Sequence, residues 1–167
     1  MVPTEFPVVL LADRREDRTL DVPVGVLATL LAGVLAFEGA SGDAECSLSL
    51  VDPDEIAALK AEHLDGDGEP TDVLSFPIDG PSDPGDGKWM VGDVVLCPSV
   101  AAAQADGHAG SAADELALLV VHGGLHLSGW DHDGPQAQAN MWARERELLT
   151  GLHGPPARDP WSDEVTR

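Results

Sequence analysis

Positive charge is scarce in this chain of 167 residues, which carries 9 lysines and arginines against 30 aspartates and glutamates. The formal net charge is −21 at pH 7. Non-specific binding of nucleic acid depends on a basic surface. The composition therefore argues against such binding, and we expect no DNA partner. Solubility or a salty cytoplasm would also explain the acidity.

Cysteines and long apolar runs are few as well. The two cysteines, Cys46 and Cys97, are far apart and match no metal-binding or redox spacing. This predicts free buried thiols in a reducing compartment. The apolar stretch at residues 22–37 is shorter than the about 20 residues of a membrane-spanning helix, and the first residues lack the basic region of a signal peptide. We therefore expect a cytoplasmic protein without membrane contact.

The elements that the sequence does contain can be read from its apolar pattern. Short apolar runs bounded by turn residues predict strands at residues 7–12, 46–51, 71–77 and 91–98. Longer segments predict five helices: residues 22–37, a helix that begins at Asp52 or Asp54 with Ile56, Leu59 and Leu64 on its inner side, an alanine-rich helix up to about Gly107, a helix that begins at Ser111, and residues 135–149. Ser111 and Asp114 have the spacing of a capping box.

This order of elements predicts an α+β or mixed α/β domain. We expect a small sheet of about four strands with about five helices, and with the helix after Ser111 in a central position. The length fits one domain, which we assign to residues 1–150. From Gly151 the chain is rich in proline and polar residues, so we expect a loose C-terminal tail at residues 151–167.

Three of the six histidines lie in the segment 120–133, with the spacing H-x3-H-x5-H. His122 and His126 are one helical turn apart and project from the same face of a helix. Gly129 can adopt the left-handed conformation that ends a helix, so the chain can turn back and bring His132 toward the other two rings. Three converging imidazoles predict a site for one Zn²⁺ per chain, with a fourth position left for water.

A pair of glycines follows the first of these histidines. Zinc peptidases with the motif H-E-x-x-H have a glutamate base at that position, whereas this chain has Gly123 and Gly124. Each glycine inside a helix costs about 1 kcal/mol relative to alanine. The pair either leaves room beside the metal for a substrate or a neighbouring backbone, or permits tight helix packing. A single histidine would be an ordinary core or surface residue, so the metal site depends on all three.

The segment from His122 to His132 resembles the signature of the YbeY-type rRNA maturation factors, which are single-strand-specific metallo-endoribonucleases. Two further segments resemble this family in the same order: P-T-D-V-L-S-F-P at residues 70–77 and G-D-V-V-L-C at residues 92–97. The segment L-V-D at residues 50–52 is similar too. Together the resemblance covers roughly residues 46–150.

The resemblance implies a metallo-hydrolase domain with zinc on His122, His126 and His132. It implies cleavage of single-stranded RNA, a role in maturing the 3′ end of 16S rRNA, and a part in quality control of the ribosome, through its small subunit, in the bacterial cytoplasm. Bound zinc would lower the pKa of its water to about 7 and polarise a phosphoryl oxygen. Many members carry a catalytic arginine in the loop before the P-T-D-V-L-S-F strand, and residues 64–69 contain none.

Three residues are candidates for binding the substrate. Lys60 is the cation nearest to the loop that lacks the arginine. On the strand at residues 71–77, alternation places Thr71 and Ser75 on one face with Val73. Their hydroxyl groups could bind phosphate or sugar, although an ordinary amphipathic strand would have the same pattern.

Two residues beside the third histidine are further candidates. Asp131 could orient an imidazole through the ring nitrogen that does not bind metal, or it could cap the turn after Gly129. Trp130 could stack on a base of single-stranded RNA, or it could be part of the core.

The sequence is compatible with two other functions. A zinc peptidase is one, and Gly123 in place of the glutamate base argues against it. The other is a non-catalytic, zinc-stabilised factor that binds ribosomal proteins, which the acidity and the missing arginine would suit.

Overall fold

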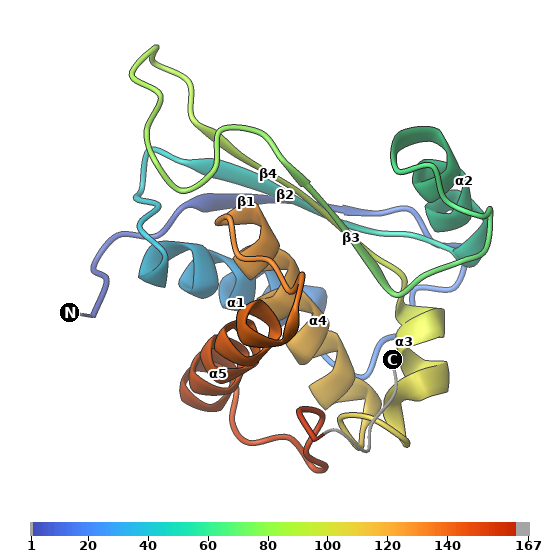
Figure 1. The fold of residues 1–167 in the computed structure, drawn as a ribbon. Helices are drawn as coiled ribbons and strands as arrows, with labels where there is room; N and C mark the ends of the chain where they lie inside the picture. Colours follow the sequence, from blue (N-terminus) through green and yellow to red (C-terminus); the bar gives the residue numbers. More distant parts are fainter. Residues whose placement is uncertain (1, 163–167) are drawn as a thin grey trace.

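The structure, a computed structural model, describes residues 2–162 (Figure 1). Over these residues the chain forms four strands and five helices. They are β1 (Val8–Asp13), α1 (Val24–Phe37), β2 (Glu45–Leu50), α2 (Pro53–His63), β3 (Val73–Pro77), β4 (Met90–Leu96), α3 (Pro98–Ala105), α4 (Ala112–Leu127) and α5 (Pro135–Leu152). The predicted α+β class and the predicted number of elements are confirmed.

The four strands form one mixed sheet with the order β1-β2-β4-β3. β1, β2 and β4 are parallel, and β3 runs antiparallel to β4 at the edge. Parallel neighbours need a long crossover connection, which α1 provides between β1 and β2. The edge position of β3 leaves one side of this strand without a strand partner, close to α4.

Helices cover the two faces of the sheet unequally. In Figure 1, α1, α4 and α5 lie on one side of the sheet and α2 lies on the other. Cys46, Leu48 and Leu50 of β2 are buried in the main core with α1 and α4, while Ser47 and Ser49 alternate with them. A smaller cluster around Ile56, Leu74 and Val95 packs between α2 and the sheet.

α4, which carries His122 and His126, contacts α1, α3, α5, β3 and β4. The middle of this helix has apolar side chains on all of its faces, and the residues from Leu116 to Val121 are each at most 2% exposed. The helix begins where the sequence predicts, because the Ser111 hydroxyl oxygen accepts a hydrogen bond from the backbone N–H of Asp114 at 3.1 Å. Packing from all sides holds the two histidines on a rigid element.

Several predicted boundaries shift. The strand expected from residue 71 begins at Val73, and the last helix extends to Leu152 rather than 149. The expectation that Leu64 lies on the inner side of α2 is wrong. α2 ends at His63, and the Leu64 side chain is 51% exposed. Both cysteines are free and buried, as predicted.

The segment after α5 is packed rather than loose. Residues 153–161, which we call the C-terminal strap, return across the start of α4. His153 Nε2 lies 2.8 Å from Asp114 Oδ1, and the Ala157 N–H donates to the other oxygen of the same carboxylate. At the end of the strap, Trp161 is buried at 7% exposure. The predicted looseness is therefore wrong for residues 151–162. Residues 163–167 lie outside the described residues, and the domain boundary at residue 150 remains a prediction.

Within residues 2–162, no helix combines the length and the apolar character that crossing a bilayer requires.

Candidate metal centre

The end of α4 turns the chain back toward the helix, as the sequence predicts. Gly129 has a φ of 95°, which is the left-handed region. Its N–H donates to the carbonyl oxygen of His126, and the N–H of Trp130 donates to that of Leu125. These two bonds form a Schellman motif. The chain that leaves it carries His132 back over the face of α4 that bears His122 and His126.

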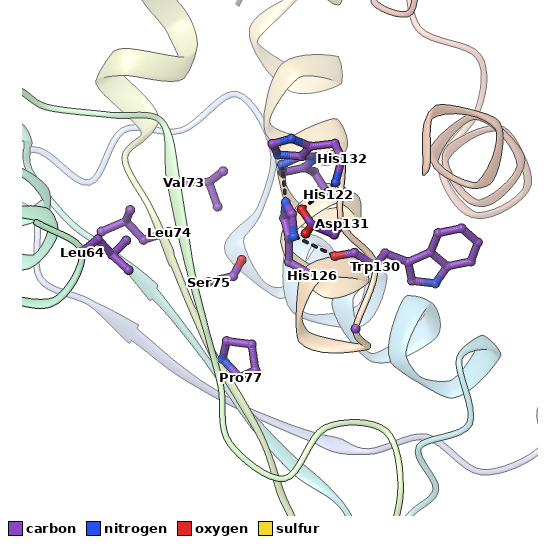
Figure 2. Close-up of a pocket in the computed structure, with 11 residues that line it drawn as sticks. Leu64, Val73, Leu74, Ser75, Pro77, His122, His126, Trp130, Asp131 and His132 are labelled. Atoms are coloured by element: carbon purple, nitrogen blue, oxygen red, sulfur yellow. Dashed lines mark hydrogen bonds between the residues drawn. The ribbon is translucent and has the colours of Figure 1, made fainter. Parts of the chain in front are cut away.

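The three imidazole rings lie together (Figure 2). Nε2 of His122 is 3.1 Å from Nε2 of His126. The ring centroid of His132 is 5.7 Å from that of His122 and 5.1 Å from that of His126. One ligand nitrogen from each residue lies within 4.8 Å of the others. Two nitrogens on one tetrahedral zinc, each at about 2.0–2.1 Å, are about 3.3 Å apart. The three rings can therefore hold a metal ion, and zinc as that ion remains a prediction.

The other ring nitrogens of the two helical histidines have acceptor partners. Nδ1 of His122 lies 2.5 Å from Oε1 of Glu145, a residue of α5 whose side chain is fully buried. Nδ1 of His126 lies 2.9 Å from the carbonyl oxygen of Trp130. A carboxylate and a carbonyl accept hydrogen bonds, so each Nδ1 carries the proton. Both rings then present an unprotonated Nε2 toward the shared point.

The protonation of His126 supports this arrangement. Burial, and after it the nearby rings of His122 and His132, lowers the pKa of His126 to about 4. The ring is therefore neutral near pH 7 and keeps a lone pair for a metal ion.

A cavity of about 530 Å³ opens in front of the three rings. Its walls combine the histidines with side chains of the edge strand β3 and of the loop after α2. The described residues that line it are Leu64, Val73, Leu74, Ser75, Pro77, His122, His126, Gly129, Trp130, Asp131 and His132. None of these is a lysine or an arginine. The cavity thus has partly apolar walls, and the three imidazoles, Ser75 and Asp131 supply its polar side chains.

The structure brings one of the three predicted substrate-binding residues to this cavity. Ser75 lines it, although its hydroxyl group donates to the carbonyl oxygen of Gly123 at 3.3 Å. Thr71 and Lys60 are not among the lining residues. Thr71 Oγ1 instead bonds to Asp72, and Lys60 Nζ pairs with Asp67 at 3.1 Å. The role of all three in binding substrate remains a prediction.

The two candidates beside His132 differ in position. The Asp131 carboxylate is exposed and accepts a hydrogen bond from the backbone N–H of His132 at 2.7 Å. The two roles considered for Asp131, orienting an imidazole and capping the turn after Gly129, both remain predictions. The Trp130 indole points away from the histidine rings in Figure 2 and donates to Glu38 at 3.3 Å. It packs against the core, which is the simpler of the two alternatives.

The glycine pair in α4 serves close packing. A Cβ atom on Gly123 would lie 3.0 Å from Val94 of β4, and one on Gly124 would lie 2.8 Å from Val34 of α1. Side chains at these positions would point into the sheet and into α1. A glutamate at position 123, as in the H-E-x-x-H motif, would therefore have to displace the side chain of Val94.

Glu145 is the site residue that the sequence analysis missed. It lies on the inner face of α5 with Met141, Leu148 and Leu149, at the spacing i, i+3, i+4 that marks a buried helix face. An acidic residue among buried apolar ones needs a partner inside the protein. That pattern could have marked Glu145 as a buried acid in need of a partner, although it does not indicate that the partner is His122.

Comparison with known proteins shows the family of this chain. Residues 14–153 match the family described as Endoribonuclease YbeY. A relative from Corynebacterium glutamicum named Endoribonuclease YbeY is 45% identical over 136 residues, which are 75% of this chain and 69% of the relative. The chain belongs to the YbeY family. The resemblance inferred from the histidine motif is confirmed.

Other YbeY relatives and a solved structure extend the comparison. A Salinispora tropica protein with the same name is 42% identical over 147 residues, covering 83% of this chain and 93% of that protein. A solution structure of a Thermotoga maritima protein has a TM-score of 0.54 at 25% identity, and covers 96% of this chain and all of that one. The fold of that Thermotoga maritima protein thus matches nearly the whole chain.

Proposed function

We propose that this protein is a zinc-dependent, single-strand-specific endoribonuclease that matures the 3′ end of 16S rRNA. In this proposal it also acts in ribosome quality control in the cytoplasm, with the small subunit as its partner. Support for the reaction comes from the relatives, which carry the name endoribonuclease. Support for a metal comes from the three histidines. The ribosomal part extends what the family resemblance implies.

The observation that carries the metal-dependent part is the contact between the two Nε2 atoms of His122 and His126. Both Nδ1 atoms are committed to acceptors, so both Nε2 lone pairs point at one place across 3.1 Å. Two lone pairs at that distance require a positive charge between them, either a shared proton or a cation. A third imidazole, that of His132, favours a metal cation because it supplies one more ligand.

The donor set fits zinc. Neutral imidazole is a preferred ligand of Zn²⁺, and three protein ligands with an open fourth position are typical of catalytic zinc sites. His122, His126 and His132 would hold the ion. When bound, zinc supplies a Lewis acid at the floor of the cavity, where a phosphoryl oxygen of RNA can approach it.

The residues of the chain orient and enclose this centre. Glu145 and the carbonyl group of Trp130 hold the two Nδ1 protons and so fix the direction of each ring. Ser75 links β3 to α4 through the carbonyl group of Gly123, which keeps the cavity wall close to the histidines. The apolar side chains of Val73 and Pro77 offer the surface of that wall to a base rather than to a phosphate.

The test compares substrates and variants in one assay. Purified zinc-loaded protein is incubated with single-stranded RNA, with the same RNA annealed to its complement, and with casein. We expect cleavage of the single strand alone, and loss of that cleavage in His126→Ala. His63→Ala is the matched control, because His63 is exposed and does not line the cavity. Equal RNA cleavage by wild type and His126→Ala would reject the proposal, and casein cleavage would indicate a peptidase.

The ribosomal part needs its own substrates. A 16S rRNA precursor with a 3′ extension is compared with an unrelated single strand of the same length. The proposal expects faster cleavage of the precursor within the extension. Equal rates on both RNAs would leave a general endoribonuclease and would remove the ribosomal assignment.

A second candidate is a non-catalytic, zinc-stabilised factor that binds the ribosome. It is favoured by the cavity lining, which contains no lysine or arginine among the described residues, and by the pairing of Lys60 with Asp67. Such a cavity has no side chain of its own to neutralise the charge that develops on a phosphoryl group. Bound zinc without cleavage of any RNA would select this candidate.

A further inference from the structure

The C-terminal strap ends at the metal centre. The indole Nε1–H of Trp161 donates to Oε2 of Glu145 at 2.9 Å. The other oxygen of that carboxylate, Oε1, lies 2.5 Å from Nδ1 of His122. A single buried carboxylate thus connects the strap to the first of the three histidines.

Each member of this chain of contacts is shielded from water. The Glu145 side chain is 0% exposed, that of His122 is 12% exposed, and Trp161 is 7% exposed. Hydrogen bonds strengthen in such surroundings, and a buried carboxylate that loses a donor pays a large desolvation cost. The position of Glu145 therefore depends on both of these donors.

Trp161 is itself held in place from the solvent side. The guanidinium group of Arg146 lies over the indole ring, 5.0 Å from its centroid. Arg146 also pairs with Asp159 of the strap at 3.6 Å, and Asp159 accepts a hydrogen bond from the backbone N–H of Trp161. These contacts aim the indole N–H at Glu145, whereas burial of the ring alone would not require that direction.

We infer that Trp161 is a positioning residue of the metal centre: the strap fixes the Glu145 carboxylate, and that carboxylate fixes the His122 ring for metal binding. The inference rests on the metal site of the proposed function. It assigns to the strap an effect on metal affinity, in addition to its packing. Groups behind a metal ligand set the orientation and the basicity of the ligand, and their loss typically lowers affinity by about 10–100-fold.

The first experiment measures zinc affinity by competition with a chromophoric chelator at neutral pH. Glu145→Gln keeps the shape of the side chain and removes its charge, and we expect zinc binding to weaken by about 10–100-fold. Trp161→Phe keeps a ring and removes the N–H donor. We expect a loss of about tenfold, at the lower end of that range.

A matched control separates positioning from packing. Trp89 is buried at 8% exposure, and its indole N–H donates to a carbonyl oxygen, that of Gly80, at 3.0 Å. Trp89→Phe is therefore the same chemical change in a similar environment, without a link to Glu145. We expect both tryptophan variants to lose similar stability in the metal-free state, and only Trp161→Phe to lose zinc affinity.

The double variant tests whether Trp161 acts through Glu145. If it does, Trp161→Phe should change the zinc affinity by less than about twofold in a protein that already carries Glu145→Leu, because leucine leaves no acceptor for the Trp161 N–H to position. An undiminished tenfold effect in that background would show an independent, structural cause and would overturn the inference.

A second measurement needs no variant and so avoids any failure to fold. Linkage requires that zinc binding stabilise the strap contact by the same factor by which the contact strengthens zinc binding. Hydrogen exchange of the indole N–H groups, followed by ¹H–¹⁵N NMR, should therefore slow by about tenfold at Trp161 on adding zinc. The indole of Trp89 in the same sample is the internal reference and should slow less.

The outcomes distinguish the two proposals. Wild-type protein that binds no zinc would overturn the metal site and this inference together. Zinc binding that is equal in wild type and Trp161→Phe, or weakened equally by Trp89→Phe, would overturn this inference and leave the metal site intact. Equal slowing of exchange at both indoles would do the same.

Discussion

The contact between α4 and α1 at Gly124 provides a test of the fold that does not involve the metal. In Gly124→Ala, the new methyl group would lie 2.8 Å from Cγ1 of Val34 and 3.1 Å from Cδ1 of Leu31. Carbon atoms in ordinary contact are about 3.5–4.0 Å apart. Both neighbours are 0% exposed and belong to α1, so the two helices must separate or a side chain must leave its rotamer.

The magnitude follows from two opposing terms. Overpacking a dense core costs about 1–3 kcal/mol, while replacing glycine by alanine within a helix gains about 1 kcal/mol. We therefore expect Gly124→Ala to lower the free energy of unfolding by up to about 2 kcal/mol. For a protein of this size, each kcal/mol shifts the melting temperature by about 2–4 °C.

Gly151→Ala is the matched control, because Gly151 lies in α5 and no atom would come within 4 Å of its Cβ. It should gain helix stability without overpacking. The assay is urea unfolding of both variants in excess chelator, so that metal binding contributes nothing. We expect Gly124→Ala to be less stable than Gly151→Ala by about 1–3 kcal/mol. Equal stabilisation of the two variants would refute the close packing of α4 on α1.

Three further predictions concern single side chains. Ser75→Ala should lower the free energy of unfolding by about 1 kcal/mol, the value of one lost hydrogen bond to Gly123, as measured by urea unfolding; no change would contradict the role of the hydroxyl as a link between β3 and α4. Burial raises the pKa of Asp114, but hydrogen bonds from His153 and Ala157 outweigh it, and the pKa is lowered. The Asp114 carboxylate then stabilises the folded protein above its unfolded pKa of about 3.9, and this stabilisation is lost as the pH falls through the lower folded pKa. The difference in free energy of unfolding between wild type and Asp114→Asn should therefore narrow below about pH 4. A difference that does not change with pH would contradict this. Burial, with Asp93 nearby, raises the pKa of Cys46 to about 12. In a Cys97→Ser variant at mildly alkaline pH, a thiol reagent should therefore modify Cys46 only after the protein unfolds. Rapid labelling of the native protein would contradict this.

Local signals in the sequence predict the parts of the site that lie close together along the chain. The spacing of His122 and His126, and a glycine at position 129 that can end a helix, are sufficient to anticipate three converging rings. Alternation likewise places Ser75 on the face of β3 that meets α4. These features depend on the periodicity of helices and strands, which can be read from a single sequence.

Features that depend on distant packing are not predicted. Glu145 follows His122 by 23 residues, and Trp161 follows Glu145 by 16, so neither contact has a local signature. The proline-rich composition after residue 150 indicates a loose tail, yet bonds to Asp114 and the burial of Trp161 hold the strap in place. Composition reports the properties of the isolated segment, whereas tertiary contacts decide whether it is ordered.

Several of the few lysines and arginines among residues 2–162 pair with acidic side chains. Arg14 pairs with Glu55, Arg15 with Asp13, Lys60 with Asp67 and Arg144 with Glu38. Each protein cation that contacts a phosphate of single-stranded RNA releases about 0.7 of a condensed counterion from the RNA. If the cavity binds single-stranded RNA as proposed, few protein cations can make such contacts, so few counterions are released. Affinity should then vary little with ionic strength, unlike that of basic RNA-binding proteins, and the complex should persist in concentrated salt.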